Sequence, residues 1–248
     1  MSAYFVMEKI VVKSKSCKGY FSKFELALWV ISVLLITASF TIFDRRNYII
    51  LVASLIGATS LIFNAKGNPI GQVLMVVFSA LYGVVSYSFS YYGEMITYLG
   101  MTAPMAVVAL IAWIRNPYNG NKAEVKVNKL KLKEFILIAV LTVVVTVAFY
   151  FILRYFNTAN LLPSTLSVTT SFIAVYLTFR RSPYFAIAYA TNDIVLIVLW
   201  ILATVTDISY LSVTVCFAVF LVNDIYGFVN WLKMQKRQHS EEAQCSEK

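Results

Sequence analysis

Long apolar segments alternate with short polar ones along most of the chain. A helix needs about 20 apolar residues to cross the hydrocarbon core of a bilayer. By that measure the sequence predicts eight membrane-crossing helices, at residues 24–43, 48–65, 70–90, 95–114, 135–153, 165–179, 184–205 and 209–231. Several gaps hold only a few residues, so neighbouring helices must form antiparallel hairpins. Pro104 falls inside the fourth span, where it is expected to kink the helix.

The composition is also that of a membrane protein. Apolar residues make up 60% of the 248 residues and charged residues only 13%, whereas a soluble domain carries about 25% charged residues. Cys17, Cys216 and Cys245 have no metal-ligand spacing and are expected to be free thiols. The one histidine, His239, stands in the C-terminal tail, which excludes a histidine-based metal or catalytic cluster. We therefore expect no cofactor and no enzyme activity.

Positive charge is distributed unevenly between the two sides of the predicted bundle. If the N-terminus is cytoplasmic, all but three of the 21 lysines and arginines fall in cytoplasmic segments, the exceptions being Arg45, Arg46 and Arg154. This is the bias of the positive-inside rule, and it predicts that both termini are cytoplasmic. The net charge of +9 is then explained by the anionic headgroups of the lipid bilayer, without a nucleic-acid partner.

The spans group into two sets of three around a central helix. AKGNPIGQVL (65–74) and FRRSPYFAIA (179–188) share a basic residue, a small polar residue and a proline, and LIAWIRN (110–116) and FVNWLKM (228–234) each end a helix with tryptophan followed by a cation. These matches favour a parallel repeat with a site between the halves; the alternative is that apolar helices look alike by composition. The expected division is 1–23 N-terminal cytoplasmic segment, 24–43 extra N-terminal helix, 48–114 first three-helix repeat, 115–134 basic cytoplasmic linker, 135–153 central linker helix, 165–232 second three-helix repeat and 233–248 cytoplasmic tail.

Two acidic residues lie within apolar spans, each directly after an asparagine: Asn192-Asp193 and Asn223-Asp224. A carboxylate at bilayer depth costs a few kcal/mol even on lenient insertion scales, so such residues usually face a bundle interior or a watery cavity. The alternative is a polar contact between helices or a turn at the membrane surface.

Four segments together resemble the PnuC family of bacterial vitamin transporters. They are NAKGNPIGQV (64–73), YSFSYYGE (87–94), the helix end at Trp113, and NDIYGFVNWLK (223–233), and the resemblance covers about residues 20–238. It implies an all-α integral membrane protein of the bacterial cytoplasmic (inner) membrane, with a SWEET-like 3+1+3 parallel repeat, an extra N-terminal helix and a homotrimeric assembly. It further implies uptake of nicotinamide riboside by facilitated diffusion, with trapping by a cytoplasmic kinase.

Other readings of the transported substrate stay open. Similar family members carry thiamine or riboflavin, and a SWEET-type sugar carrier is the rival on fold. Many members also have a tryptophan one helical turn before the polar residue of the seventh span, where this sequence has Tyr189.

Nicotinamide riboside has a flat cationic ring, a carboxamide and ribose hydroxyls, which call for aromatic faces and for Asn, Gln or Asp side chains. Asp193 shares a helix stripe with Tyr189 and Trp200, and Asn223 shares one with Gly227. We therefore expect Asp193 and Asn223 to reach the ligand, and Asn192 and Asp224 to bond neighbouring helices. Pro104 and Gly227 are expected hinges. The full candidate substrate-binding set is Gln72, Tyr82, Tyr87, Tyr189, Asn192, Asp193, Trp200, Asn223, Asp224 and Tyr226, with Tyr91 beside it on the third span.

Overall fold

The computed structural model describes residues 19–88, 92–158 and 160–246, so Cys17 and Tyr91 lie outside the described residues. Within these ranges, eight helices are long and apolar enough to cross a membrane, which confirms the predicted number. The elements are α2 (Lys23–Phe43), α3 (Tyr48–Ala65), α4 (Ile70–Ser88), α5 (Tyr92–Thr97), the π-helix η1 (Tyr98–Thr102), α6 (Ala103–Ile114), β1 (Pro117–Tyr118), β2 (Asn121–Val125), α7 (Leu132–Tyr155), α8 (Leu161–Phe179), α9 (Tyr184–Thr204), the 3-10 helix η2 (Ile208–Tyr210) and α10 (Leu211–Ser246).

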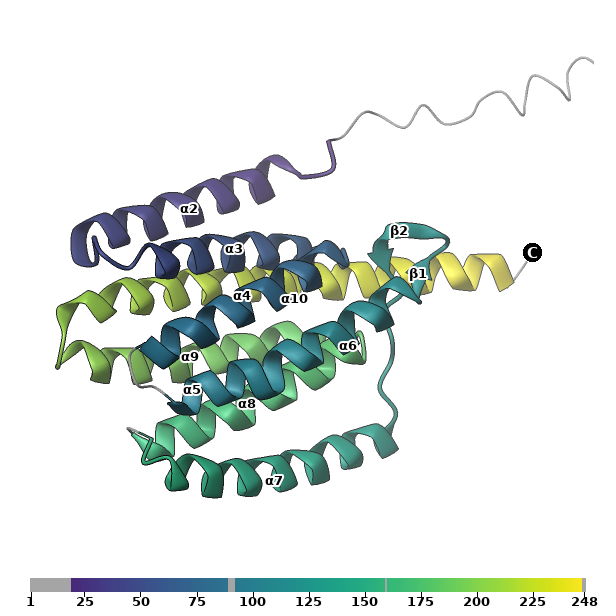
Figure 1. The fold of residues 1–248 in the computed structure, drawn as a ribbon. Helices are drawn as coiled ribbons and strands as arrows, with labels where there is room; N and C mark the ends of the chain where they lie inside the picture. Colours follow the sequence, from purple (N-terminus) through teal and green to yellow (C-terminus); the bar gives the residue numbers. More distant parts are fainter. Residues whose placement is uncertain (1–18, 89–91, 159, 247–248) are drawn as a thin grey trace, which may run out of the picture.

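Six of the long helices form a closed ring. Around it, α3 packs against α4, α4 against α6, α6 against α8, α8 against α9, α9 against α10, and α10 against α3. Helix α2 lies outside the ring against α10 and α3, and α7 lies outside it against α8, so that Figure 1 shows them on opposite sides of the bundle. The ring is therefore built from the two predicted sets of three helices, with the two additional helices at its periphery.

The fourth span is interrupted where the sequence predicts a kink. Helix α5 passes into the π-helix η1, and the backbone N–H of Ala103 donates to the carbonyl of Tyr98, five residues earlier. Pro104 follows directly, in the first turn of α6. Proline lacks the N–H that an uninterrupted helix would use, so a wider turn before it accommodates the missing bond. Tyr98 and Thr102, the first and last residues of η1, both line the central cavity.

The segment expected as a plain basic linker contains a β-hairpin. Strands β1 and β2 pair antiparallel, and the turn between them has positive φ at Asn119 (48°) and Gly120 (77°). Asn-Gly is the dipeptide that two-residue hairpin turns favour, because both positions need φ above zero. Figure 1 shows the hairpin against the last turns of α10, which continues to Ser246 instead of ending near residue 231.

Buried polar contacts hold the hairpin to this extension of α10. Gln238 is buried, its side-chain oxygen accepts from the Val127 N–H at 2.8 Å, and its amide nitrogen donates to Glu124 at 2.8 Å. Tyr118 donates to Glu241 at 2.7 Å. The hairpin follows the first set of three helices and α10 ends the second, so these contacts join the two sets outside the apolar part of the bundle.

The two sets also contact each other through a reciprocal pair of hydrogen bonds. The indole of Trp113, at the end of α6, donates to the carbonyl of Thr178 at 2.9 Å, and the indole of Trp231, on α10, donates to the carbonyl of Asn64 at 2.8 Å. Asn64 and Thr178 directly precede the two segments that match in sequence, and both tryptophan side chains are fully buried. The last helix of each set thus binds the C-terminal end of the first helix of the other.

The turns after these two helix ends have the same conformation. Gly67 and Arg181 occupy equivalent positions and have φ values of 67° and 56°. Each donates its backbone N–H three residues back, Gly67 to Asn64 at 2.9 Å and Arg181 to Thr178 at 3.0 Å. An arginine at positive φ is unusual, so the agreement reflects a shared backbone geometry and not a shared glycine.

Candidate functional site

A small enclosed cavity lies inside the ring of six helices. Its volume is about 30 Å³, which is room for a water molecule or two. All six ring-forming spans contribute to its wall, so the cavity lies between the two sets of helices. The lining residues are Leu61, Met75, Phe78, Tyr98, Thr102, Ser171, Tyr189, Asn192, Asp193, Phe217, Phe220 and Asp224.

The acidic side of the cavity is formed by Asp193 on α9 and Asp224 on α10. Both are buried, and their carboxyl groups are near enough to interact directly. Oδ2 of Asp193 has no hydrogen-bond partner among the described residues. None of the described residues that line the cavity is Lys, Arg or His. Two buried carboxyl groups that face each other without a counter-charge favour the binding of protons or of a cation.

Asn192 lines the same cavity and is oriented by α8. Its side-chain oxygen accepts hydrogen bonds from Thr170 at 2.8 Å and from Ser171 at 3.0 Å. These bonds agree with the expectation that Asn192 contacts a neighbouring helix. They also leave the amide nitrogen as the group that can donate to a ligand in the cavity.

The opposite side of the cavity is aromatic. The ring of Phe78 lies 5.9 Å from that of Tyr98 and 5.7 Å from that of Phe220, in edge-on arrangements. Tyr98 is in turn 4.6 Å from Tyr82. Tyr189 completes the wall on the side of the carboxylates. The cavity wall thus combines aromatic rings with the acidic pair.

Several candidate residues lie beside the cavity and not in its lining. Trp200 is fully buried and packs edge-on against Tyr82 at 6.2 Å, so both belong to the core under the cavity wall. Gln72 is buried between α3 and α4, where its amide donates to Asn64 at 2.8 Å. Tyr87 is 62% exposed, against Tyr92 at 6.1 Å between ring centres.

Asn223 and Tyr226 face α2 instead of the cavity. The amide of Asn223 donates to Ser32 at 2.9 Å, and the hydroxyl of Tyr226 donates to Glu25 at 2.8 Å. Glu25 also forms an ion pair with Lys66 at 3.2 Å. The structure thus differs from the expected roles on α10, because Asp224 lines the cavity while Asn223 joins α10 to the extra N-terminal helix.

The two expected hinges lie in different surroundings. Pro104 follows the π-helix that carries Tyr98 and Thr102, whereas Gly227 is in the middle of the continuous helix α10. A Cβ added at Gly227 would have its nearest neighbours, on Ala65 and Ala186, at 3.7 Å, which is ordinary contact distance.

Sequence reasoning missed three residues of interest. Tyr98 and Thr102 are the first and last residues of the π-helix and line the cavity, and the sequence signal for this interruption is Pro104. Glu94, in the fourth span, is fully buried and interacts with Ser167 of α8. It falls in the gap between the predicted spans 70–90 and 95–114, so the criterion that found Asp193, an acidic residue within an apolar span, did not select it.

Among the described residues, eight apolar helices, six of them around a central cavity that contains two buried carboxyl groups, define a multi-pass membrane protein of the transporter class. The family model described as "Nicotinamide mononucleotide transporter" matches residues 47–233. The chain therefore belongs to this family of transporters, which confirms that it is not an enzyme.

Similar proteins carry a more specific name. A "Nicotinamide riboside transporter PnuC" of Neisseria mucosa is 28% identical over 224 residues, which cover 88% of this chain and 84% of the relative. Another with this name, from Haemophilus influenzae, is 23% identical over 77% of this chain and 82% of the relative. The crystal structure of "the Vitamin B3 transporter PnuC" is similar with a TM-score of 0.77 and 24% identity, covering 88% of this chain and 94% of that one. The resemblance to the PnuC family is thereby confirmed.

Proposed function

We propose that this chain carries nicotinamide riboside across the bacterial cytoplasmic membrane by facilitated diffusion. The observation that supports this choice is the charge of the cavity. It has two carboxylates, Asp193 and Asp224, and no basic residue among its described lining. The pyridinium ring of nicotinamide riboside is a cation, so its charge complements this pair.

The same charge pattern disfavours nicotinamide mononucleotide, although the family description names it. The mononucleotide adds a phosphate to the riboside, and phosphate recognition normally uses Arg, Lys or backbone N–H groups. Placing that phosphate beside two buried carboxylates would instead add like charges at low dielectric. The names of the relatives, which specify the riboside, agree with this argument.

The remaining groups of the cavity match the rest of the molecule. The ring would lie against Phe78 and Tyr98, where stacking and cation–π contact contribute roughly 0.5–2 kcal/mol. The amide nitrogen of Asn192 would donate to the carboxamide oxygen, and the carboxylates would accept from ribose hydroxyls as well as balance the ring charge. Tyr189 would close the cavity on the side of the carboxylates, at the position where many family members have tryptophan.

Transport requires the cavity to enlarge. Ligand pockets measure about 300–1,000 Å³, roughly ten times or more the enclosed 30 Å³. We propose that the two sets of helices are repeats that rock against each other, because their matching turns and reciprocal tryptophan bonds relate them as equivalent units. The π-helix before Pro104 and the glycine at position 227 are the proposed bending points.

The same proposal extends to assembly and cellular context. Both termini would be cytoplasmic, as the distribution of basic residues favours, and the protein would assemble as a homotrimer in the lipid bilayer. A cytoplasmic kinase would phosphorylate the riboside after entry, which traps it because the resulting anion no longer fits the acidic cavity.

Uptake into sealed vesicles tests this proposal. Purified protein would be reconstituted into liposomes, and entry of labelled nicotinamide riboside, nicotinamide mononucleotide, thiamine, riboflavin and a hexose would be measured in turn. We expect the riboside to equilibrate across the membrane without accumulating, and the mononucleotide to be excluded. Preferred uptake of thiamine, riboflavin or the hexose would replace the proposed substrate, and accumulation driven by a sodium or proton gradient would refute facilitated diffusion.

A further inference from the structure

We propose that the groove between α2 and α10 is a specific binding site for an anionic phospholipid. Its acyl chain would lie along the apolar groove, and its phosphate would lie at Lys233. The site is separate from the central cavity, and the proposal does not depend on what the protein carries.

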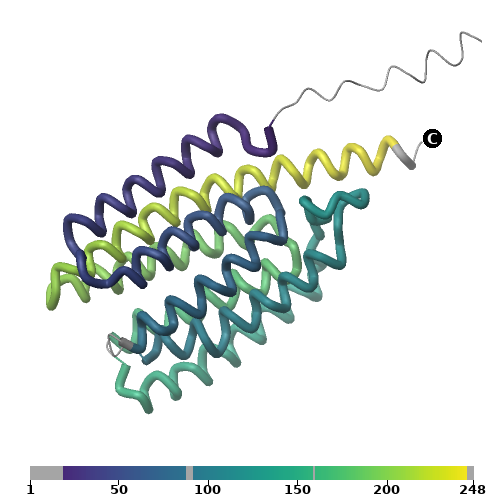
Figure 2. The backbone as a smooth tube through the Cα atoms, turned by 45° about the horizontal axis from the view of Figure 1, so that its top comes forward, coloured from purple at the N-terminus to yellow at the C-terminus, as the bar shows by residue number. Residues whose placement is uncertain are grey.

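The first observation is the shape and lining of the groove. It has a volume of about 610 Å³, and apolar side chains of both helices line most of its length, among them Phe24, Leu28, Val222 and Val229. Phe24, Val222 and Val229 are 62%, 54% and 44% exposed, so the protein itself leaves this surface uncovered. Figure 2 shows α2 lying alongside α10 over this part of the bundle.

The second observation is the charge at one end of the groove. Lys233 lines the groove there, and no acidic side chain is part of the described lining. Lys23 stands beside the lining residues Ser22 and Phe24 at the start of the span formed by α2. Neither lysine forms an ion pair within the described residues. The apolar groove therefore ends in uncompensated positive charge at the level where the membrane-crossing segment begins.

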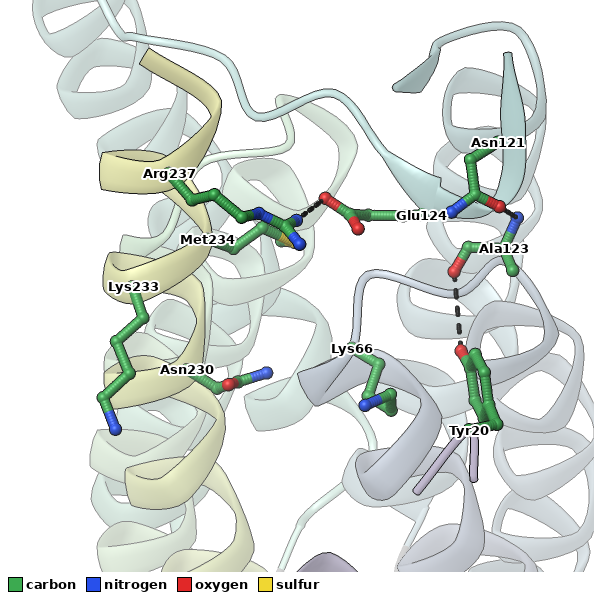
Figure 3. Close-up of a pocket in the computed structure, with 9 residues that line it drawn as sticks. All are labelled: Tyr20, Lys66, Asn121, Ala123, Glu124, Asn230, Lys233, Met234 and Arg237. Carbon is green, nitrogen blue, oxygen red and sulfur yellow. Dashed lines mark hydrogen bonds and ion pairs between the residues drawn. The ribbon is translucent and has the colours of Figure 1, made fainter. Parts of the chain in front are cut away.

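The third observation is a polar cleft on the other side of Lys233. This cleft, drawn in Figure 3, has a volume of about 250 Å³ and is also lined by Lys66, Asn230 and Arg237. Figure 3 shows the Lys233 side chain running back along α10, away from Arg237. Arg237 is paired with Glu124 and Lys66 with Glu25, so Lys233 is the cation without an ion pair among the described residues that line the cleft.

The cleft, Lys233 and the groove follow one another in the same order as the headgroup, the phosphate and the acyl chain of a phospholipid. A polar headgroup would occupy the cleft, the phosphate would meet Lys233, and an acyl chain would fill the groove. A cationic residue beside an anionic headgroup contributes about 1 kcal/mol. A soluble phosphate ester would use the cleft but gain nothing from the apolar groove, and a second copy of the chain would need a carboxylate to face Lys233.

Native mass spectrometry of the purified protein tests the proposal. Dioleoyl phosphatidylglycerol and dioleoyl phosphatidylcholine would be titrated separately, with glycerol 3-phosphate as the soluble comparison. The variants are Lys233→Gln, which removes the charge, and Val229→Trp, which fills the groove. Lys133→Gln is the matched control, because Lys133 is also an exposed lysine at one end of an apolar span, in α7, and is not among the residues that line the groove.

We expect tight retention of phosphatidylglycerol over phosphatidylcholine. Lys233→Gln should weaken phosphatidylglycerol binding about fivefold, Val229→Trp should weaken both lipids, and Lys133→Gln should change neither. Equal retention of the two lipids, or equal effects of Lys233→Gln and Lys133→Gln, would overturn the proposal.

Two further outcomes would assign the groove to another occupant and also overturn the proposal. One is that glycerol 3-phosphate displaces the lipid from the wild type and that the Val229→Trp variant retains both lipids as well as the wild type does. The other is efficient cross-linking between two copies through Val222→Cys in liposomes. Size-exclusion elution and the thermal unfolding midpoint establish that each variant is folded. If Val229→Trp is unstable, Lys233→Gln still tests the proposal, because it changes only an exposed side chain.

Discussion

The proposed charge complementarity makes a quantitative prediction for the two cavity aspartates. Asp193→Asn replaces one carboxylate by an uncharged amide of about the same size and leaves Asp224 in place. Hydrogen bonds to charged groups contribute about 1.5–3 kcal/mol. One carboxylate remains in the single variant, so the loss should be near the lower limit, about tenfold in affinity. The double variant with Asp224→Asn should lose about 3 kcal/mol, or roughly 150-fold.

Burial makes these estimates appropriate for the site. Asp193 is 4% exposed and Asp224 is 5% exposed, so water screens little of their interaction with a bound cation. Oδ2 of Asp193 has no hydrogen-bond partner among the described residues, so an asparagine there breaks no known protein contact of that atom. The variants should therefore fold, and affinity should report the lost charge.

Equilibrium binding by titration calorimetry measures the effect, with reduced nicotinamide riboside as the internal control. The reduced ring is uncharged but has nearly the same shape. We expect the oxidised form to lose affinity in steps from the single to the double variant. The reduced form should lose less at each step, because it keeps the ribose hydroxyls but has no ring charge. The reasoning is refuted if the double variant binds the oxidised riboside within threefold of the wild type, or if both forms lose affinity equally.

The other predictions concern contacts around the site. Asn223→Ala should keep riboside affinity within about twofold while lowering stability by about 1 kcal/mol, because its amide bonds α2; a binding assay and thermal unfolding distinguish this from a role in the site. Gly71→Ala should destabilise the protein by about 1–3 kcal/mol, since its Cβ would meet a backbone nitrogen of α3 at 2.7 Å. Gly227→Ala should keep the stability of the wild type, because the nearest neighbours of its Cβ would be at 3.7 Å. Slower uptake at unchanged affinity in Gly227→Ala would support the hinge. Burial and a neighbouring carboxylate raise the pKa of Tyr118 to about 12, above its ordinary value of about 10. The stabilisation by this neutral phenol is complete below pH 10 and is lost toward pH 12, so protease cleavage of the hairpin should rise in that interval, and Tyr118→Phe should remove this dependence.

The sequence was sufficient for the number of helices and for one part of the site. Eight spans follow from apolar segments, because bilayer thickness sets helix length, and Asp193 stands out because a carboxylate in an apolar span is costly. The choice between Asn223 and Asp224 could not be made in this way. Adjacent residues differ by about 100° around a helix, and which of them faces the cavity depends on where α2 packs against α10.

Other features depend on backbone details that hydropathy does not record. The π-helix adds one residue to a turn of the fourth span, and it contains Tyr98 and Thr102, which line the cavity. The hairpin carried a readable signal in Asn119-Gly120, but the basic character of the segment directed the interpretation toward a linker. Its docking on α10 depends on Gln238, a residue of the tail whose partners lie more than 100 positions away in the chain.

The closed cavity and the tryptophan bonds together constrain how the protein can open. Trp113 and Trp231 lie 5.4 Å apart between ring centres at the hairpin end of the bundle, and each donates to the first helix of the opposite set. A rocking motion that opens this end must break both buried bonds and leave their donors and acceptors unpaired, at about 1–3 kcal/mol for each unsatisfied group. Because the bonds are equivalent, neither set can move without breaking both at once. Opening at this end is therefore a single cooperative step, and water entering between the sets, or the substrate itself, must satisfy the released groups.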